Sequence, residues 1–181
     1  MGNYLRNTVG VVSAIADTPG SLAVFDALAV SWWRLSEWRE AFVDRSEFRI
    51  ADHVSIAVTD DERYGPGFWT QTRGMVKFAR PDLQMKHLPG DYSTGNPAIR
   101  VSGVVLNGIA SYLAQGARVR DGQTMYLPET DATVTFLLSE DKETRKHFNN
   151  SALEVCDFDE KTGMAGEGVG RLLERAGRVM G

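Results

Sequence analysis

Residues 68–88 alternate between apolar and polar side chains and are interrupted by a proline at position 81. Because successive side chains of a β-strand point to opposite faces, the alternation from Phe68 to Ala79 predicts a strand with one apolar-leaning face and one cationic face. Proline lacks a hydrogen-bond donor and pushes Arg80, the residue before it, toward extended geometry, so we expect the strand to end there. A second extended segment is expected over residues 82–88.

The segment from Phe48 to Thr59 alternates in the same way, and a turn-rich connection over residues 60–67 follows it. We expect these two alternating segments to pair as an antiparallel hairpin. If both apolar sides face one core, the numbers of paired residues must sum to an even value, because a slip of one residue would turn one side outward. This register places on one sheet face His53, Ser55, Gln71, Arg73 and Lys77. It buries together Val54, Ile56, Val76 and Phe78.

The N-terminal part carries a strand pattern followed by a helix pattern. Residues 8–16 form a short apolar run that we interpret as a buried strand. Asp17-Thr18-Pro19 is a typical helix start, because a capping side chain precedes a proline. Apolar residues then recur at steps of three and four as far as Val43, which predicts one long amphipathic helix.

A second helix is predicted from Pro97 to Gln115. Asn96 is its expected N-cap, and Gly116 is expected to end it in the left-handed conformation. Gly103 and Gly108 each cost about 1 kcal/mol relative to alanine inside a helix, so we expect them to permit close packing against the sheet.

The remaining patterns predict short strands and a terminal helix. Asp121-Gly122 is a turn signal that favours a hairpin between residues 117–120 and 124–127. Strands are expected over residues 133–138 and 152–158, and a helix over residues 168–180. We therefore expect one α+β domain spanning residues 1–181, with a mainly antiparallel sheet packed against two long helices and a short C-terminal helix.

The charge balance and the single cysteine exclude several classes of function. The chain has 181 residues, with 20 Lys+Arg against 24 Asp+Glu, and the resulting charge of −4 does not favour nucleic-acid binding. Cys156 alone can form neither an intrachain disulfide nor a cysteine-based zinc cluster, so a cytoplasmic location is expected. No apolar run reaches the roughly 18 to 20 residues that a membrane span requires.

The sequence TRGMVKFARPDLQM, a following helix and the turn residues from Gly116 to Thr124 form a recognisable pattern. This pattern resembles uncharacterised bacterial domains with a TxGMxKFGRPDL-like core. The resemblance covers residues 69–124, and a weaker similarity is found at residues 148–150. Ala79 stands where that core has glycine. The resemblance implies no activity.

No residue spacing predicts a metal site or a catalytic centre. His53, His87 and His147 lack the spacing of metal ligands, and we expect neither a metal nor a cofactor. A nucleophilic pair of Cys156 and His147 has no local signature around it, so a structural cysteine is favoured. The glycine-rich segment 163–170 precedes a helix but lacks the lysine and hydroxyl residue of a phosphate-binding loop, which favours a flexible connection.

Cationic side chains that gather around residues 73–87 are the best candidates for binding. Arginine can hold a carboxylate or phosphate through two parallel hydrogen bonds, and neighbouring cations strengthen this preference. The candidate ligand-binding residues are Arg73, Lys77, Trp69, Arg80 and His53. We expect a non-enzymatic binding module for a protein partner or a small anionic ligand, using the sheet face that carries Arg73 and Lys77. The alternative is a small hydrolase or transferase with dispersed His, Asp and Glu residues, and self-association stays open.

Overall fold

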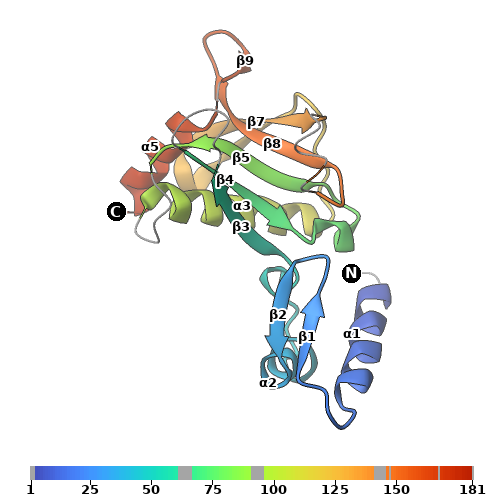
Figure 1. Cartoon of the computed structure of the whole chain (residues 1–181). Coiled ribbons are helices and arrows are strands. Elements are labelled where there is room, and N and C mark those ends of the chain that lie inside the picture. Colours follow the sequence, from blue (N-terminus) through green and yellow to red (C-terminus); the bar gives the residue numbers. More distant parts are fainter. Residues whose placement is uncertain are drawn as a thin grey trace.

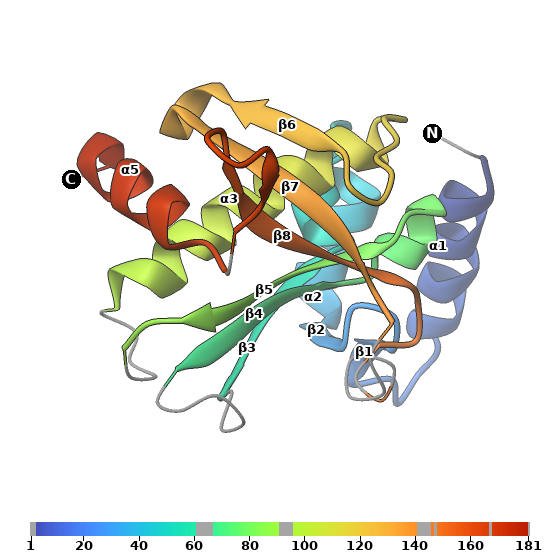
Figure 2. The same cartoon turned by 90° about the horizontal axis from the view of Figure 1, so that it is seen from above.

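A mixed β-sheet organises the larger part of the chain (Figure 1). The computed structural model describes residues 3–60, 67–90, 96–140, 146, 148–166 and 168–180. In the described part the main path of the sheet is β3 (Ser55–Asp60), β4 (Phe68–Arg73), β5 (Asp82–Leu88), β8 (Ala152–Asp159), β7 (Ala132–Ser139) and β6 (Thr124–Leu127), and a seventh strand, β9 (Met164–Ala165), pairs with β8. Figure 2 shows these strands side by side in this order. The pair β5/β8 is parallel and the other pairs are antiparallel, so the fold is α+β with a mostly antiparallel sheet.

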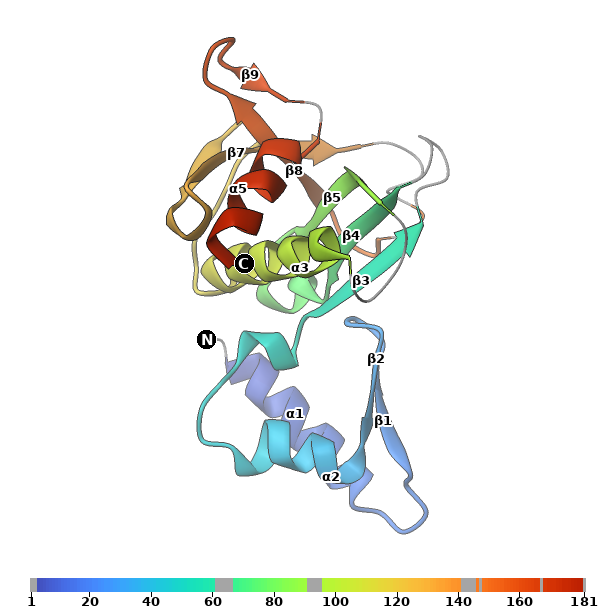
Figure 3. The same ribbon diagram turned by 90° about the vertical axis from the view of Figure 1, so that its left-hand side faces the viewer.

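Two helices cover one face of the sheet (Figure 3). Helix α3 (Pro97–Ala114) contacts β4 and β5, and helix α5 (Gly170–Met180) contacts β7 and β8. The helix start at Asn96 is confirmed, because its Oδ1 accepts a hydrogen bond from the Ala98 amide at 2.9 Å. The end at Gly116 is also confirmed, with φ at +119°. Fully buried core side chains between sheet and helices include Leu83, Met85, Leu106, Leu113, Phe136 and Leu172.

The N-terminal prediction is wrong in both of its elements. Residues 3–16 form helix α1 (Asn3–Ala16), because Leu5, Val9 and Val12 also share one helical face. The expected helix over residues 17–43 is instead a hairpin followed by short helical segments: β1 (Ala23–Asp26), β2 (Ser31–Arg34), α2 (Leu35–Trp38) and the π-helix η1 (Arg39–Asp44). The expectation of two long helices on the sheet therefore does not hold.

The Asp26 side chain shapes the turn between β1 and β2. Its Oδ1 accepts hydrogen bonds from the backbone amides of Leu28 and Ala29, both at 3.1 Å. Such a bond gives the backbone a local alternative to the helical ladder, and it closes the turn between β1 and β2. We call residues 3–52 the N-terminal lobe; it lies below the sheet in Figure 1.

The central hairpin is confirmed in register but not in length. Ser55 pairs with Arg73 and Asp60 with Phe68, so the paired numbers sum to an even value throughout. However, β4 ends at Arg73, because Gly74 has φ at +108° and the chain then enters the 3-10 helix η3 (Met75–Phe78). Only glycine fits here, since an added Cβ would lie 2.5 Å from the carbonyl oxygen of His53.

The early strand end changes the predicted buried set. Val54 is buried, and Ile56 and Phe78 are half-buried against the same core. Val76 lies in η3 rather than in the sheet. The chain before β3 is also not extended, because the 3-10 helix η2 (Ile50–Asp52) precedes it.

The other strands agree with the sequence except in one pairing. The predicted strands 82–88, 133–138 and 152–158 correspond to β5, β7 and β8, and the terminal helix corresponds to α5. The hairpin predicted between residues 117–120 and 124–127 is wrong, because β6 pairs with β7. Gly122 instead turns toward β7, and its amide donates to the Phe136 carbonyl at 2.7 Å. Most of the expected connection 60–67, residues 61–66, and His147 lie outside the described residues.

No helix in the described part of the chain is long and apolar enough to cross a membrane.

Candidate functional site

The five predicted binding residues lie in three separate places. Trp69 and Arg73 share one face of β4, Lys77 and His53 lie where the N-terminal lobe meets the sheet, and Arg80 lies at the end of α3. The sequence therefore placed Trp69 and Arg73 together correctly, but it did not foresee that the other three point elsewhere.

Lys77 holds the N-terminal lobe to the sheet. Its Nζ forms an ion pair with Asp26 of β1 and donates to the carbonyl oxygen of His53 at 2.8 Å. Both charged side chains are largely buried, with 6% and 13% of their surface exposed. Burial lowers the pKa of Lys77, and the hydrogen bond to Asp26 opposes that shift. The charge of Lys77 is thus already neutralised within the chain.

His53 is a buried member of an aromatic cluster. Its ring lies 4.7 Å from the ring of Phe48, 4.9 Å from that of Phe42 and 6.1 Å from that of Phe78. Burial, assisted by the nearby charge of Lys77, lowers the pKa of His53 from 6.5 to about 4. The imidazole is therefore neutral near pH 7 and acts as an aromatic side chain.

Arg80 caps the C-terminal end of α3. Its Nε donates to the carbonyl oxygens of Leu113 and Ala117, at 3.1 and 2.9 Å, and another guanidinium nitrogen donates to the Gly116 carbonyl at 3.0 Å. A helix ends with unsatisfied carbonyls and a partial negative charge, and this guanidinium satisfies both. These bonds give Arg80 a structural role.

Arg73 is the half-buried cation of the β4 face. It donates to Gln71 Oε1 at 3.0 Å, and its guanidinium carbon lies 4.4 Å from the centre of the Phe148 ring. Burial lowers the pKa of Arg73, and the negative charge of Asp82 opposes the shift. Trp69 is buried beside it and packs on the same phenylalanine, with ring centres 5.9 Å apart. Arg73 thus has a preformed aromatic support.

The sheet face that carries Arg73 continues across β5 and β8 with polar side chains. Lys86 Nζ lies 3.1 Å from a carboxylate oxygen of Glu154, and Gln84 Nε2 donates to Ser139 at 2.7 Å. Lys86, which belongs to the cationic cluster noted in the sequence, is therefore ion-paired.

Asp157 occupies the N-terminus of α5. Its two carboxylate oxygens accept hydrogen bonds from the amides of Arg171 and Leu172, at 2.7 and 2.9 Å. An anion at this position satisfies the first amides of a helix. The chain supplies its own carboxylate where a phosphate would bind. Segment 163–170, expected to be a flexible connection, contains β9, whose residues Met164 and Ala165 pair with β8.

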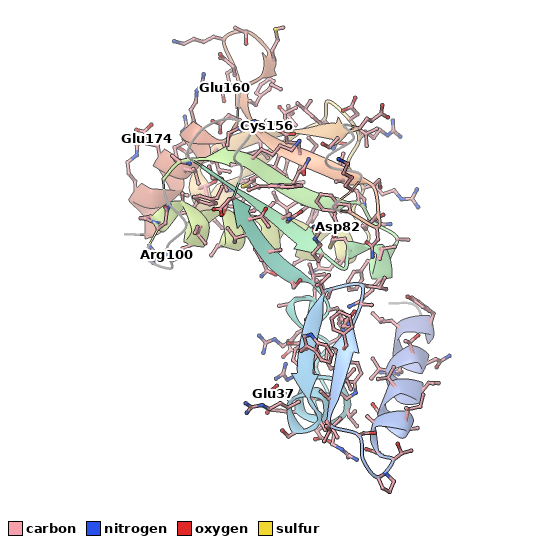
Figure 4. The ribbon with its side chains drawn as sticks, viewed as in Figure 1. Glu37, Asp82, Arg100, Cys156, Glu160 and Glu174 are labelled. Carbon is pink, nitrogen blue, oxygen red and sulfur yellow. The ribbon has the colours of Figure 1, made fainter. Side chains whose placement is uncertain are left out.

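Cys156 is buried on β8 (Figure 4). Burial and the neighbouring carboxylate of Glu154 raise the pKa of its thiol to about 12, so the reactive thiolate is scarce near pH 7. Among the described residues, no three His, Cys, Asp or Glu side chains come together as metal ligands would. His53 lies in the aromatic cluster, and the carboxylate of Asp82 accepts hydrogen bonds from Thr72 Oγ1 at 3.1 Å and from the Met75 amide at 3.2 Å.

The sequence interpretation missed an exposed apolar surface on the hairpin β1/β2. Phe25 and Trp32 face each other across the two strands, with ring centres 4.6 Å apart, yet they are 46% and 71% exposed. Exposed neighbours in the same segment are Leu22, Leu28 and Val30. These five residues are called the hairpin surface below. Residues 23–26 (AVFD) and 31–34 (SWWR) do not alternate between apolar and polar side chains, and a helical pattern covers the same residues, so no clear signal in the sequence marks this hairpin.

Comparisons with protein-family models, with curated proteins and with solved structures found no match to this chain.

Proposed function

We propose that this chain is a non-enzymatic binding module that recognises a protein partner, with the hairpin surface at the centre of the contact. The observation that carries the proposal is the exposed stacked pair of Phe25 and Trp32. Tryptophan is strongly enriched among the residues that dominate protein interfaces, and exposed apolar patches mark such sites.

The size of the hairpin surface fits a protein better than a small ligand. Phe25 and Trp32 stack across the two strands, and exposed Leu22, Leu28 and Val30 lie before β1 and in the turn that follows it, so the exposed apolar side chains are spread along the hairpin as a protein interface would require. A two-stranded hairpin is also marginally stable alone, so a partner that covers its outer face would stabilise it.

Arg73 fits at the edge of this surface. Ser55, its paired residue on β3, donates to the carbonyl oxygen of Ala29 at the tip of the hairpin. Arg73 is therefore close to the hairpin tip and able to meet a carboxylate of the partner. Lys77 was expected to contact the ligand directly. Its ion pair with Asp26 of β1 instead stabilises the hairpin that carries the contact surface.

The other candidate functions have less support. A small anion at Arg73 would use that side chain alone, because Lys77 and Lys86 are ion-paired and Arg80 caps α3. For a hydrolase or transferase, the neutral, enclosed His53 and the raised pKa of Cys156 supply neither a general base nor a nucleophile.

The proposal is tested by comparing partners recovered on immobilised wild-type protein with those recovered on the double variant Phe25→Ser, Trp32→Ser. Tyr112→Ser removes an equally exposed aromatic residue from α3 and is the matched control. The recovered partner is then purified and titrated by calorimetry. We expect the double variant to lose at least tenfold in affinity, Arg73→Ala several-fold, and Tyr112→Ser nothing.

Two results would contradict the proposal. One is equal affinity of the wild type and the folded double variant, which would remove the hairpin surface from the contact. The other is concentration-dependent dimerisation that the double variant abolishes, which would show a second copy of the chain to be the occupant.

A further inference from the structure

A separate pocket of about 390 Å³ lies in the N-terminal lobe between α1 and η1. These two segments contact each other, and Figure 3 shows α1 beside the helical stretch that begins with α2. The volume falls in the range of small-molecule sites. Its apolar lining includes Leu5, Val9, Phe42 and Phe48.

The π-helix shapes one wall of this pocket. Ala41, Phe42 and Val43 are consecutive residues, yet all three line it. Neighbouring residues of an α-helix point about 100° apart, and the wider π-helical turn alters these directions. π-Helical turns are rare in proteins, and those that occur are frequently found at functional sites.

The walls are held in place by a polar contact. The indole nitrogen of Trp38, at the end of α2, donates to Ser13 Oγ of α1 at 3.1 Å. Trp38 itself is buried and packs on Phe42, with ring centres 4.2 Å apart. Trp38 therefore holds both walls of the pocket, α1 through Ser13 and η1 through Phe42.

Charges around the pocket favour an anion. Arg45 forms an ion pair with Asp52 at 2.8 Å, which neutralises both. In the described part of the chain, Arg6 and Arg49 have no ion-pair partner, and Glu47 is the remaining acidic residue of the lining. The two arginines therefore leave a net positive charge beside an apolar cavity.

Gly10 keeps one side of the pocket open. It lies one turn after Arg6 on α1, and a Cβ added there would meet nothing within 4 Å. Glycine costs about 1 kcal/mol relative to alanine in a helix interior. His53 completes the lining as a neutral aromatic side chain.

We propose that this pocket binds an apolar molecule that carries one carboxylate, with the apolar body against Val9 and Phe42 and the carboxylate held by Arg6 and Arg49. Arginine suits this role because its planar fork matches a carboxylate. The site is separate from the hairpin surface and does not depend on the proposed protein partner.

The probes are sodium octanoate, octan-1-ol as its uncharged match, and inorganic phosphate, each titrated into the full chain by calorimetry. Octanoate is expected to bind with one-to-one stoichiometry, and octanol and phosphate at least tenfold more weakly. In the double variant Arg6→Gln, Arg49→Gln, octanoate should fall to the level of octanol. The matched control is Arg100→Gln on α3, outside the pocket, which should leave binding unchanged (Figure 4).

Gly10→Leu supplies an independent variant, because leucine is a better helix former and its side chain would fill the open space. We expect an unchanged or higher melting temperature together with loss of octanoate binding. The proposal is overturned if octanoate does not bind the wild type saturably, if octanol binds as tightly, or if either pocket variant binds octanoate like the wild type.

Discussion

Ala79 occupies the left-handed region of backbone conformation, with φ at +52°. A residue with a Cβ pays about 1 to 2 kcal/mol there, whereas the greater freedom of glycine in the unfolded chain costs roughly 0.5 to 1 kcal/mol. We therefore predict that Ala79→Gly raises the free energy of unfolding by about 0.5 to 1 kcal/mol.

Urea denaturation measures this effect. Ala57→Gly is the matched control, because Ala57 lies in extended strand β3. We expect this variant to change the free energy of unfolding by about the same amount in the opposite direction, so that it is less stable than the wild type. A loss of stability in Ala79→Gly as large as in the control would show that the left-handed backbone is not strained.

His53 predicts how stability depends on pH. Its pKa is about 4 in the folded chain, lowered from 6.5, so between these values the unfolded chain binds more protons. Stability therefore falls as pH decreases from 6.5 to 4, by at most about 1.4 kcal/mol per pH unit from this group. We expect His53→Phe, which keeps the aromatic contacts, to remove that part of the decline.

The measurement is urea denaturation of the wild type and the variant at several pH values from 4 to 7.5. The control is His87→Asn, because His87 is exposed and asparagine tolerates its positive φ of 56°. Parallel profiles for the wild type and His53→Phe would contradict the buried neutral imidazole.

At the scale of elements, the two glycines of α3 have different roles. An added Cβ at Gly103 would lie 3.9 Å from Ile56 on β3, whereas one at Gly108 would meet nothing within 4 Å. The expectation that both glycines pack closely on the sheet is thus wrong for Gly108. It lines a groove of about 600 Å³ between α3 and β6, where Val104 and Tyr112 are exposed.

This difference predicts opposite effects of one substitution. Gly103→Leu should destabilise the protein by about 1 to 3 kcal/mol, because the larger side chain overpacks against Ile56. Gly108→Leu should instead stabilise it by several tenths of a kcal/mol, because leucine is the better helix former and has free space. Thermal unfolding of the two variants measures both effects. If Gly108→Leu lowers the melting temperature as much as Gly103→Leu does, the groove beside Gly108 has no room for the leucine side chain.

At the scale of the whole molecule, the buried pair of Lys77 and Asp26 is expected to couple the N-terminal lobe to the sheet. Removing one partner of a buried pair costs about 3 to 5 kcal/mol, because the other charge stays buried. The single-domain prediction requires that the wild type unfolds in one transition. In Asp26→Asn we expect the lobe to unfold first.

Tryptophan fluorescence and far-ultraviolet circular dichroism can separate the two events, because three of the four tryptophans, Trp32, Trp33 and Trp38, lie in the lobe. Asp17→Asn is the matched control, since it breaks an exposed ion pair with Arg39 that contributes little. Two transitions in the wild type would mean that the chain is not one cooperative domain.

The sequence by itself determined the elements whose local signals agree with their burial. Asn96, Pro97 and Gly116 bound α3, and the parity of alternation decided the register of β3 against β4. It also placed Arg73 and Trp69 correctly on one face of β4. These features depend on neighbours within a few residues, or on a period of two that any buried sheet face enforces.

Tertiary structure alone decided the remainder. The apolar run of residues 8–16 fits a strand or a helix, and the steps of three and four residues up to Val43 favour a helix. The structure instead has a helix followed by a hairpin, with a turn at Asp26 and α1 packed on η1. Likewise, the partner of β6 is β7 rather than the segment next to it in sequence. The charge of Lys77 is neutralised by a carboxylate 51 residues away, and a local pattern holds no information about such a contact. Which cations are available to a ligand is therefore set by how the chain folds back on itself.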